Sequence, residues 1–236
     1  MIYAGTSGWA YPAWKPSFYP AKLASVKFLG YYASRLNSTE VNYTFRRFPT
    51  AKLLDGWVAA TPAQFNFAIK AHQSITHIKR LRDAGESARS FIAALQPLSE
   101  ASRLGPVLFQ LPPFLKCDPG RLKDFLAELP KDQRVAFEFR DPSWFCDEIY
   151  DLLRGANAAL CLAESEKLET PNVQTADFCY LRLRDPEKLT SQKARKDLLQ
   201  RVKDLAHRGD VFAYFKHEDS PKGAIHAEEL LASAKD

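Results

Sequence analysis

The stretch RVAFEFRDPSWF, from Arg134 to Phe145, decides the fold of this chain. Its apolar and polar residues alternate with a period of two, which predicts a strand with one bulky apolar face and one polar face. The apolar face consists of Val135, Phe137 and Phe139, and the opposite face of Ala136, Glu138 and Arg140. Pro142 ends the strand, Ser143 can cap a helix, and Trp144 opens it. A strand that ends in charges and runs into a helix is typical of the rim of an α/β active site.

The same order of strand and then helix recurs on both sides of this stretch. We expect strands over residues 2–7, 37–43, 65–71, 106–111, 134–140, 158–163, 178–184 and 211–215. We expect helices over residues 25–35, 50–60, 75–103 (broken near Gly85), 190–207 and 225–234. A further helix begins at Asp118, and another follows the fifth strand and ends near Arg154. We expect three helices to start at cap residues: Thr50, Thr190, and Asp118, which is followed by Pro119. Residues 164–175 contain a proline and are too short for a good helix, so we expect an irregular connection after the sixth strand.

Eight strands that alternate with helices predict a parallel sheet, because each crossover returns the chain to the same end. At this length a single TIM-like (β/α)8 barrel domain over residues 1–236 is the most economical α/β architecture. A doubly wound open sheet is the alternative. It would normally carry a glycine-rich first turn, and Gly5-Thr6-Ser7-Gly8 does not fit GxGxxG.

Composition limits the class of protein. The chain has 236 residues, 46% hydrophobic residues and a net charge of +5, which permits anionic partners without demanding nucleic acid. No apolar run approaches the roughly 20 residues of a membrane helix, and the start lacks the features of a signal peptide. The four cysteines form no CxxC pair, so we expect reduced thiols in a cytoplasmic protein with no membrane partner. The oligomeric state has no signal in the sequence.

Several motifs together resemble the YecE-like family, also called domain of unknown function 72. The motifs are Gly5-Thr6-Ser7-Gly8-Trp9 with Tyr11 and Trp14, Phe18-Tyr19-Pro20, Glu40-Val41-Asn42 with Thr44-Phe45 and Pro49, Lys70-Ala71 with Ile75-Thr76-His77, Phe109-Gln110-Leu111-Pro112-Pro113, and Glu138-Phe139-Arg140 with Pro142-Ser143-Trp144. The resemblance covers nearly the whole chain. It implies a one-domain TIM-like barrel and no settled activity, so it supplies no substrate.

The chain departs from the family pattern mostly near strand ends. The family usually has an arginine where this chain has His72-Gln73, and often an Asp where Glu164 stands. It often has a His near Arg184-Asp185, and usually an Asn pair where Lys216-His217-Glu218 stands. These differences predict a ligand different from that of the relatives.

The polar strand faces predict a site inside the barrel. If the bulky apolar faces meet the helices, the axis receives Glu40, Asn42, Lys70, Gln110, Glu138, Arg140, Arg182 and Arg184 near the carboxyl ends of the strands. TIM-barrel sites lie at that end. Glu138 or Glu40 would then act as acid or base, while Lys70, Arg140 and Arg182 would hold a phosphate or carboxylate. Alternatively, the charges form an ion-pair network that only braces the barrel.

Other groups complete the set of candidates. Lys70 could form a Schiff base, but we expect Glu40, Glu138 and Arg140 to keep it charged, which argues against that role. His77 could be a base or a packing group. Trp9, Tyr11 and Trp144 could stack on a ligand at the rim or simply pack, and Lys216 is a further binding candidate. The sets of basic residues at 79–82 and 193–208 read as solvated helix faces.

No organic cofactor is expected, because no dinucleotide, Walker or GxSxG motif is present. A divalent metal would need Glu40, His72, Glu138, Glu164 and His217, and the interleaved cations oppose it. The leading hypothesis is an acid/base enzyme, a hydrolase by preference, acting on an anionic substrate that is phosphorylated or nucleotide-like. The alternatives are a nucleic-acid-binding or processing barrel of phosphoesterase or endonuclease type, and a ligand-binding barrel without catalysis.

Overall fold

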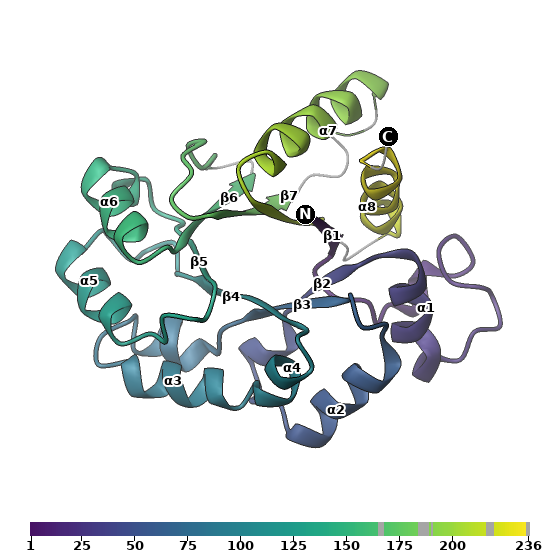
Figure 1. The fold of residues 1–236 in the computed structure, drawn as a ribbon, viewed down its shortest axis with the longest axis horizontal. Coiled ribbons are helices and arrows are strands. Elements are labelled where there is room, and N and C mark those ends of the chain that lie inside the picture. The colour runs from purple at the N-terminus through teal and green to yellow at the C-terminus, as the bar shows by residue number, and fades with distance from the viewer. Residues whose placement is uncertain (165–167, 184–188, 190, 216–219, 235–236) are drawn as a thin grey trace.

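The computed structural model describes residues 1–164, 168–183, 189, 191–215 and 220–234. Figure 1 looks into a ring of eight strands with the helices arranged outside it, which is the predicted α/β TIM-like barrel. The strands are β1 (Ile2–Thr6), β2 (Ser38–Val41), β3 (Asn66–Lys70), β4 (Leu104–Gln110), β5 (Val135–Glu138), β6 (Ala159–Glu164), β7 (Phe178–Leu183) and β8 (Asp210–Phe215). The helices are α1 (Phe28–Arg35), α2 (Ala51–Ala60), α3 (Gly85–Ala93), α4 (Gln96–Glu100), α5 (Pro119–Ala127), α6 (Asp147–Gly155), α7 (Gln192–Ala206) and α8 (Lys222–Ser233).

The strands pair in parallel in the order β1-β8-β7-β6-β5-β4-β3-β2. The register places Gln110 beside Glu138, so these two inward side chains stand next to each other at the carboxyl ends of β4 and β5. The described part of the connection from β6 to β7, residues 168–177, contains no helix, which confirms the irregular segment that the sequence predicts. In the described part of the chain no helix is both long and apolar enough to cross a membrane.

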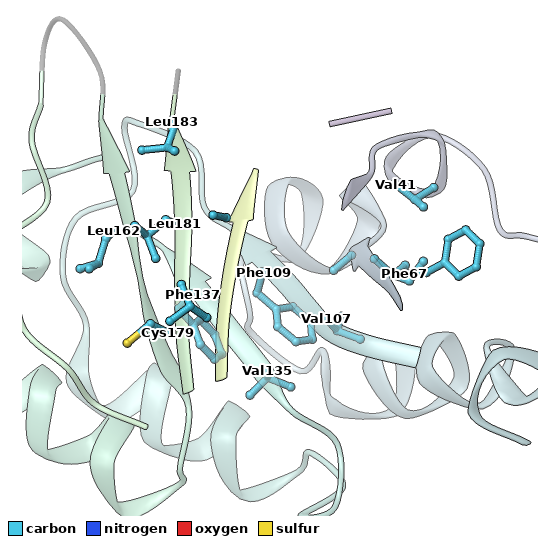
Figure 2. Packing of buried hydrophobic residues seen from close by; sticks show 14 of the residues in the cluster. Val41, Phe67, Val107, Phe109, Val135, Phe137, Leu162, Cys179, Leu181 and Leu183 are labelled. Atoms are coloured by element: carbon cyan, nitrogen blue, oxygen red, sulfur yellow. The ribbon is translucent and has the colours of Figure 1, made fainter. Parts of the chain in front are cut away.

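Two buried clusters separate the faces of the strands. Bulky side chains fill the space between the strands and the helices, and Figure 2 shows Val41, Phe67, Val107, Phe109, Val135, Phe137, Leu162, Cys179, Leu181 and Leu183 among them. The interior of the ring holds a second cluster of small and aromatic residues: Ala68, Leu108, Ala136, Ala159, Cys161, Ala163, Phe178, Tyr180, Phe212 and Tyr214. The apolar faces therefore meet the helices, as the alternation predicts.

Side chains close the ring between β1 and β2, which stand at the two ends of the pairing order. Asn37 exchanges two hydrogen bonds with the backbone of β1, at 2.9 and 2.8 Å. The Tyr32 hydroxyl accepts from the Thr6 amide at 2.8 Å and donates to the Ser38 carbonyl at 3.0 Å. Gly5 permits this close approach, since a Cβ there would lie 1.8 Å from the Ser38 carbonyl oxygen. The Tyr32 hydroxyl and the Asn37 side-chain amide thus take the place of backbone hydrogen bonds between β1 and β2.

The quoted stretch ends differently from the prediction. β5 stops at Glu138, and Pro142–Trp144 form only a short 3₁₀ helix. Asp141, not Ser143, caps that turn by accepting from the Ser143 amide, and α6 starts at Asp147. The cap therefore lies two residues before the predicted one, and the Asp141 carboxylate accepts from both the amide and the hydroxyl of Ser143.

The predicted helical region 75–103 is divided into three pieces. A π-helix covers Ser74–Ile78, and α3 and α4 follow. Between the π-helix and α3, the residues Arg80, Leu81 and Asp83 have positive φ angles. This conformation ends a helix, and non-glycine residues adopt it at a cost in free energy. At the start of α7 the Ser191 side chain accepts from the Ala194 amide, while the predicted cap, Thr190, lies outside the described residues.

Candidate active site at the barrel mouth

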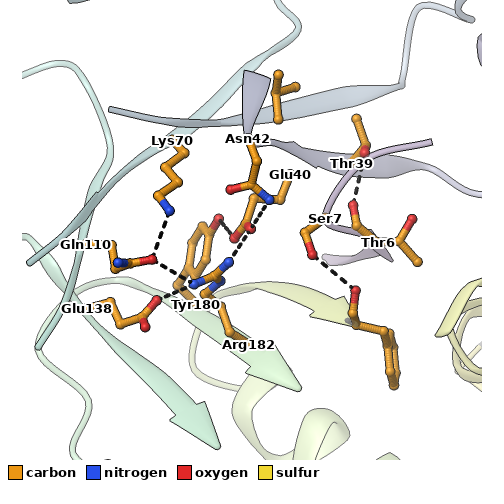
Figure 3. Close-up of polar contacts among 12 residues, drawn as sticks. Thr6, Ser7, Thr39, Glu40, Asn42, Lys70, Gln110, Glu138, Tyr180 and Arg182 are labelled. Atoms are coloured by element: carbon orange, nitrogen blue, oxygen red, sulfur yellow. Dashed lines mark hydrogen bonds and ion pairs between the residues drawn. The ribbon is translucent and has the colours of Figure 1, made fainter. Parts of the chain in front are cut away.

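Charged and polar side chains from five strands meet inside the ring near the carboxyl ends of the strands. Figure 3 shows Glu40 of β2, Lys70 of β3, Gln110 of β4, Glu138 of β5 and Arg182 of β7 converging on one another. The sequence predicts this set from the alternation of the strands, and the structure brings it together. The inner aromatic cluster lies beneath it, because Tyr180 precedes Arg182 on the same face of β7.

Arg182 is the centre of the buried part of the site. Its Nη2 donates to Glu40 Oε1 at 2.8 Å and its Nη1 to Glu138 Oε2 at 2.5 Å. Burial alone would lower the pKa of Arg182, but Glu138 and Glu40 outweigh burial and hold that pKa well above its usual value. One guanidinium therefore neutralises parts of two buried carboxylates, whose exposed fractions are 0% for Glu40 and 1% for Glu138.

Each carboxylate has further donors. Glu40 accepts from the Tyr180 hydroxyl at 2.8 Å and from Asn42 Nδ2 at 3.3 Å. Glu138 accepts from Arg140 Nε at 2.9 Å. Since the donors are positioned by several strands, the carboxylates stand in a fixed arrangement.

Lys70 differs from the two arginines. Its Nζ donates to Gln110 Oε1 at 2.9 Å and lies 4.2 Å from the centroid of the Phe45 ring. Within the described ranges it forms no ion pair with a carboxylate, whereas Arg182 forms two and Arg140 one. The ammonium is only partly exposed. It is the cation in this group whose charge is left without a direct described counterion.

The pKa of Lys70 is lowered to about 8, which corrects the expectation that its neighbours keep it fully charged. Burial is the largest cause, and the positive charge of Arg182 adds to it. Glu40 and Glu138 act in the opposite direction but do not compensate, and Arg140 lowers the pKa further because it is itself a cation. At neutral pH a substantial minority of Lys70 is therefore the free amine.

Gln110 links the cations. Its Oε1 accepts from Lys70 Nζ at 2.9 Å, from Arg140 Nη2 at 3.1 Å and from Arg182 Nη1 at 3.4 Å. An amide oxygen has two lone pairs and carries no net charge, so it orients three cations without neutralising any of them.

His77 belongs to the same end of the barrel. The π-helix carries it, its ring packs edge-on against Phe45 with centroids 4.9 Å apart, and its Nδ1 lies 2.9 Å from Thr76 Oγ1. Its pKa is lowered by burial and by the positive charges of Lys70 and Arg140. Imidazole at this position is therefore neutral near pH 7 and can accept a proton. π-helical turns recur at functional sites in proteins.

The comparisons with known proteins come from the whole chain. The model of the family "Protein of unknown function DUF72" matches residues 3–236. This chain belongs to that family. A DUF72 family protein from Thermotoga maritima is similar over 100% of both chains, with 27% identity and a TM-score of 0.85. Another from Enterococcus faecalis is 18% identical with a TM-score of 0.81, over 98% of this chain and 96% of its own, and shows the fold alone.

A curated relative gives the same family assignment. The UPF0759 protein YunF of Bacillus subtilis is 32% identical over 161 residues, which is 64% of this chain. The match covers 55% of YunF, so this chain spans about half the length of that relative. None of these descriptions names an activity, and the chemistry of this DUF72 chain must be inferred from its own residues.

Three aromatic candidates make packing contacts. Trp144 is fully buried, stacks on Phe139 with centroids 4.6 Å apart, and donates to the Leu115 carbonyl, so it packs and does not face the rim. Trp9 packs against Trp57 and Phe67. Tyr11 donates to the carbonyl of Ser7 at 3.2 Å and packs on Trp14. Trp9 and Tyr11, in the long first loop of this DUF72 barrel, thus take part in packing.

The structure describes only some of the remaining candidates. Lys216, His217 and Arg184 lie outside the described residues. Of the other metal-ligand candidates, His72 is bonded to Ser74 and Glu164 is paired with Arg201 at 2.9 Å. Among the described residues no group of three potential metal ligands was found. The four cysteines, Cys117, Cys146, Cys161 and Cys179, are free thiols.

Sequence reasoning missed two members of the site. Tyr180 shares the inward face of β7 with Arg182, but a tyrosine next to apolar residues gives no signal that its hydroxyl bonds a carboxylate. Phe45 lies in a 3₁₀ turn after β2. Its contact with Lys70 arises because β2 and β3 are neighbouring strands, which the sequence around Phe45 does not indicate. The strand-end position of Thr44, which donates to the Lys70 carbonyl at 2.7 Å, could have drawn attention to this turn.

Proposed function

We propose that this DUF72 protein is an enzyme that binds an anionic organic molecule at the mouth of the barrel and uses Lys70 as its acid or base. The observation that carries the proposal is the state of Lys70: a partly buried ammonium that lies beside two guanidinium groups and pairs with no described carboxylate. A bound phosphate or carboxylate would supply the missing negative charge.

The charge of the described group supports an anionic ligand. Glu40 and Glu138 contribute two negative charges, and Lys70, Arg140 and Arg182 contribute three positive charges when Lys70 is protonated. The surplus charge is that of Lys70, which is partly exposed and lies beside Arg140, whose side chain is 31% exposed. A site with low-polarity walls strengthens attraction for an anion at that position.

The two carboxylates have a supporting role in this proposal. Both are held by Arg182, and each has a further donor, so both are already engaged within the described group. Lys70 has a pKa near the working pH and therefore suits acid/base catalysis better. Hydrolysis of a phosphorylated or nucleotide-like substrate is one reaction that this arrangement supports.

A second candidate function, binding or processing of nucleic acid, rests on the loops beside the mouth. Tyr43 and Phe114 are 47% and 62% exposed, and the Arg80 guanidinium lies 4.9 Å from the Phe114 ring centroid. Arg46 and Arg80 are exposed on the loops after β2 and β3. Aromatic rings and arginines of this kind stack bases and contact phosphates. Binding of an oligonucleotide that weakens steeply with salt would support this candidate.

Variants of the mouth test the main proposal. Lys70→Met and Arg140→Gln should each weaken binding of inorganic phosphate, measured by calorimetry, by about ten-fold or more while the fold is retained. Lys52→Met is the matched control, since Lys52 is exposed on α2. The same variants are then assayed against a panel of phosphomonoesters and nucleotides. Equal phosphate affinity in all three variants would contradict the proposal, and tight binding without turnover would favour a non-catalytic binding barrel.

A further inference from the structure

We propose that Lys70 is a nucleophile that forms an imine with an aldehyde or ketone whose other end carries a carboxylate or phosphate. The inference rests on the proposed function, because the anionic end of the substrate is to be held by Arg140. It narrows the substrate to carbonyl compounds and changes the role of Lys70 from proton exchange to covalent catalysis.

The distance between the two cationic groups fits such a substrate. Lys70 Nζ and Arg140 Nη2 both donate to Gln110 Oε1, at 2.9 and 3.1 Å, so the two nitrogens lie about 6 Å apart at most. In a 2-oxo acid or a glyoxylate-like molecule the carbonyl carbon is bonded directly to the carboxylate carbon. A carbonyl carbon in contact with Nζ therefore leaves the carboxylate within hydrogen-bond reach of the Arg140 guanidinium.

Burial and neighbouring cations favour the neutral amine of Lys70. The charged groups that face it are Arg182 of β7 and Arg140, which follows β5, and they outweigh Glu40 and Glu138 when burial is added. A lysine that is desolvated and placed next to other cations is the usual design of an imine-forming residue. The lowered pKa of Lys70 agrees with this arrangement and makes the free amine about a hundred times more abundant at neutral pH than for an exposed lysine.

Neighbouring groups also suit the chemistry. The Nζ lone pair attacks the carbonyl carbon, and the electron pair of the C–O π bond moves to oxygen, which takes up a proton. The nitrogen releases two protons in all. One is the proton that the alkoxide takes up, and the other protonates the resulting hydroxyl, which leaves as water while the nitrogen lone pair forms the C=N bond, so that amine and carbonyl yield imine and water with no other reactant. The partly buried His77 on the π-helix is a neutral imidazole close enough to Lys70 to feel its charge, and it can carry one of these protons.

Reductive trapping tests the inference on the wild-type protein. The probe is glyoxylate with sodium cyanoborohydride at pH 7.5, followed by peptide mapping by mass spectrometry. Lys70 should gain a carboxymethyl group at least about ten times faster than exposed lysines such as Lys52, because about a hundred times more of it is the free amine while its partial burial slows access. Inorganic phosphate should slow the labelling of Lys70 but not of Lys52, and Arg140→Gln should slow it as well.

The outcomes separate the two proposals. Preferential labelling of Lys70, lost in Lys70→Arg, supports the imine. If Lys70 labels no faster than Lys52 while phosphate still binds at the mouth, the imine is overturned and the proposed anion site stands. If Lys70 labels no faster and phosphate does not bind, both proposals fail. Equal preference of Lys70 for glyoxylate and for uncharged propanal would overturn the role of Arg140 in holding the substrate.

Discussion

At the scale of single residues, the buried ion pair between Arg182 and Glu138 should stabilise the barrel more than the partly exposed pair between Arg140 and Glu138. Glu138→Gln would leave one side of a buried guanidinium without a counterion, and removal of one partner of a buried ion pair typically costs about 3–5 kcal/mol. We expect this loss of unfolding free energy in urea denaturation. Arg140→Ala removes a half-exposed partner and should cost less than about 1.5 kcal/mol.

Glu148→Gln is the control for this comparison, because Glu148 is exposed in the first turn of α6. It should change stability by no more than about 1 kcal/mol. An unfolding free energy of Glu138→Gln equal to that of the control would contradict the bracing role of the ion pair.

The alternation of polar residues predicts which side chains face the axis, since the period of a strand determines its faces. It does not predict the protonation of Lys70, because that depends on burial and on cations from other strands. Nor does it reveal that Trp144 turns inward, since its indole bonds the carbonyl of a residue 29 positions away. The local pattern predicts the face of the strand on which a side chain lies, while its charge state and the packing of its ring depend on tertiary contacts.

At the scale of elements, two loops beside the mouth are joined through Asp141. Asp141 Oδ1 accepts from the Ser143 hydroxyl at 2.6 Å, and its Oδ2 accepts from Lys116 Nζ at 2.9 Å. The Ser143 hydroxyl in turn accepts from the Cys117 amide at 2.9 Å. These contacts connect the loop after β4 to the loop after β5 and so hold Arg140 next to Gln110.

Asp141→Asn should destabilise the protein at pH 7 by about 1–2 kcal/mol, because it removes the charge from these hydrogen bonds. Ser143 and Lys116 lower the pKa of Asp141 to about 2. Its contribution is therefore present above pH 4 and is lost as the pH falls through 2. Thermal unfolding of both proteins should show a difference in Tm at pH 7 that shrinks toward pH 2. A difference that does not depend on pH would contradict this account.

The elements themselves were largely predictable, and their ends were not. The strand and helix periods predict all eight strands, because each has a clear apolar face. The π-helix at Ser74–Ile78 and the left-handed residues after it carry no such pattern, since a π turn and an α turn use the same residue types.

At the scale of the whole molecule, ring closure depends on Tyr32. Tyr32→Phe would leave the Thr6 amide and the Ser38 carbonyl buried without this partner, at a cost of about 1–3 kcal/mol. Tyr43→Phe is the matched control, because the Tyr43 side chain is 47% exposed. Urea denaturation should show a lower midpoint for Tyr32→Phe than for the control. Equal midpoints would mean that the seam between β1 and β2 does not limit stability.

The count of eight strands predicts the barrel, but nothing in the sequence announces that its last seam is closed by side chains. That seam combines Tyr32 of α1, Asn37 after it and Gly5 of β1, which come together only in the fold. Such cooperation between distant residues is a property of the closed ring.

The most direct test of the central claim is the pKa of Lys70, read from the Cε carbon resonances of ¹³C-labelled lysines against pH. The resonance missing in Lys70→Arg should titrate near 8. Added phosphate should move its pKa upward, because the added negative charge stabilises the ammonium, as Glu40 and Glu138 do, against burial and the positive charges of Arg182 and Arg140. A Lys70 resonance that titrates with exposed lysines, near about 10.4, and ignores phosphate would contradict the account.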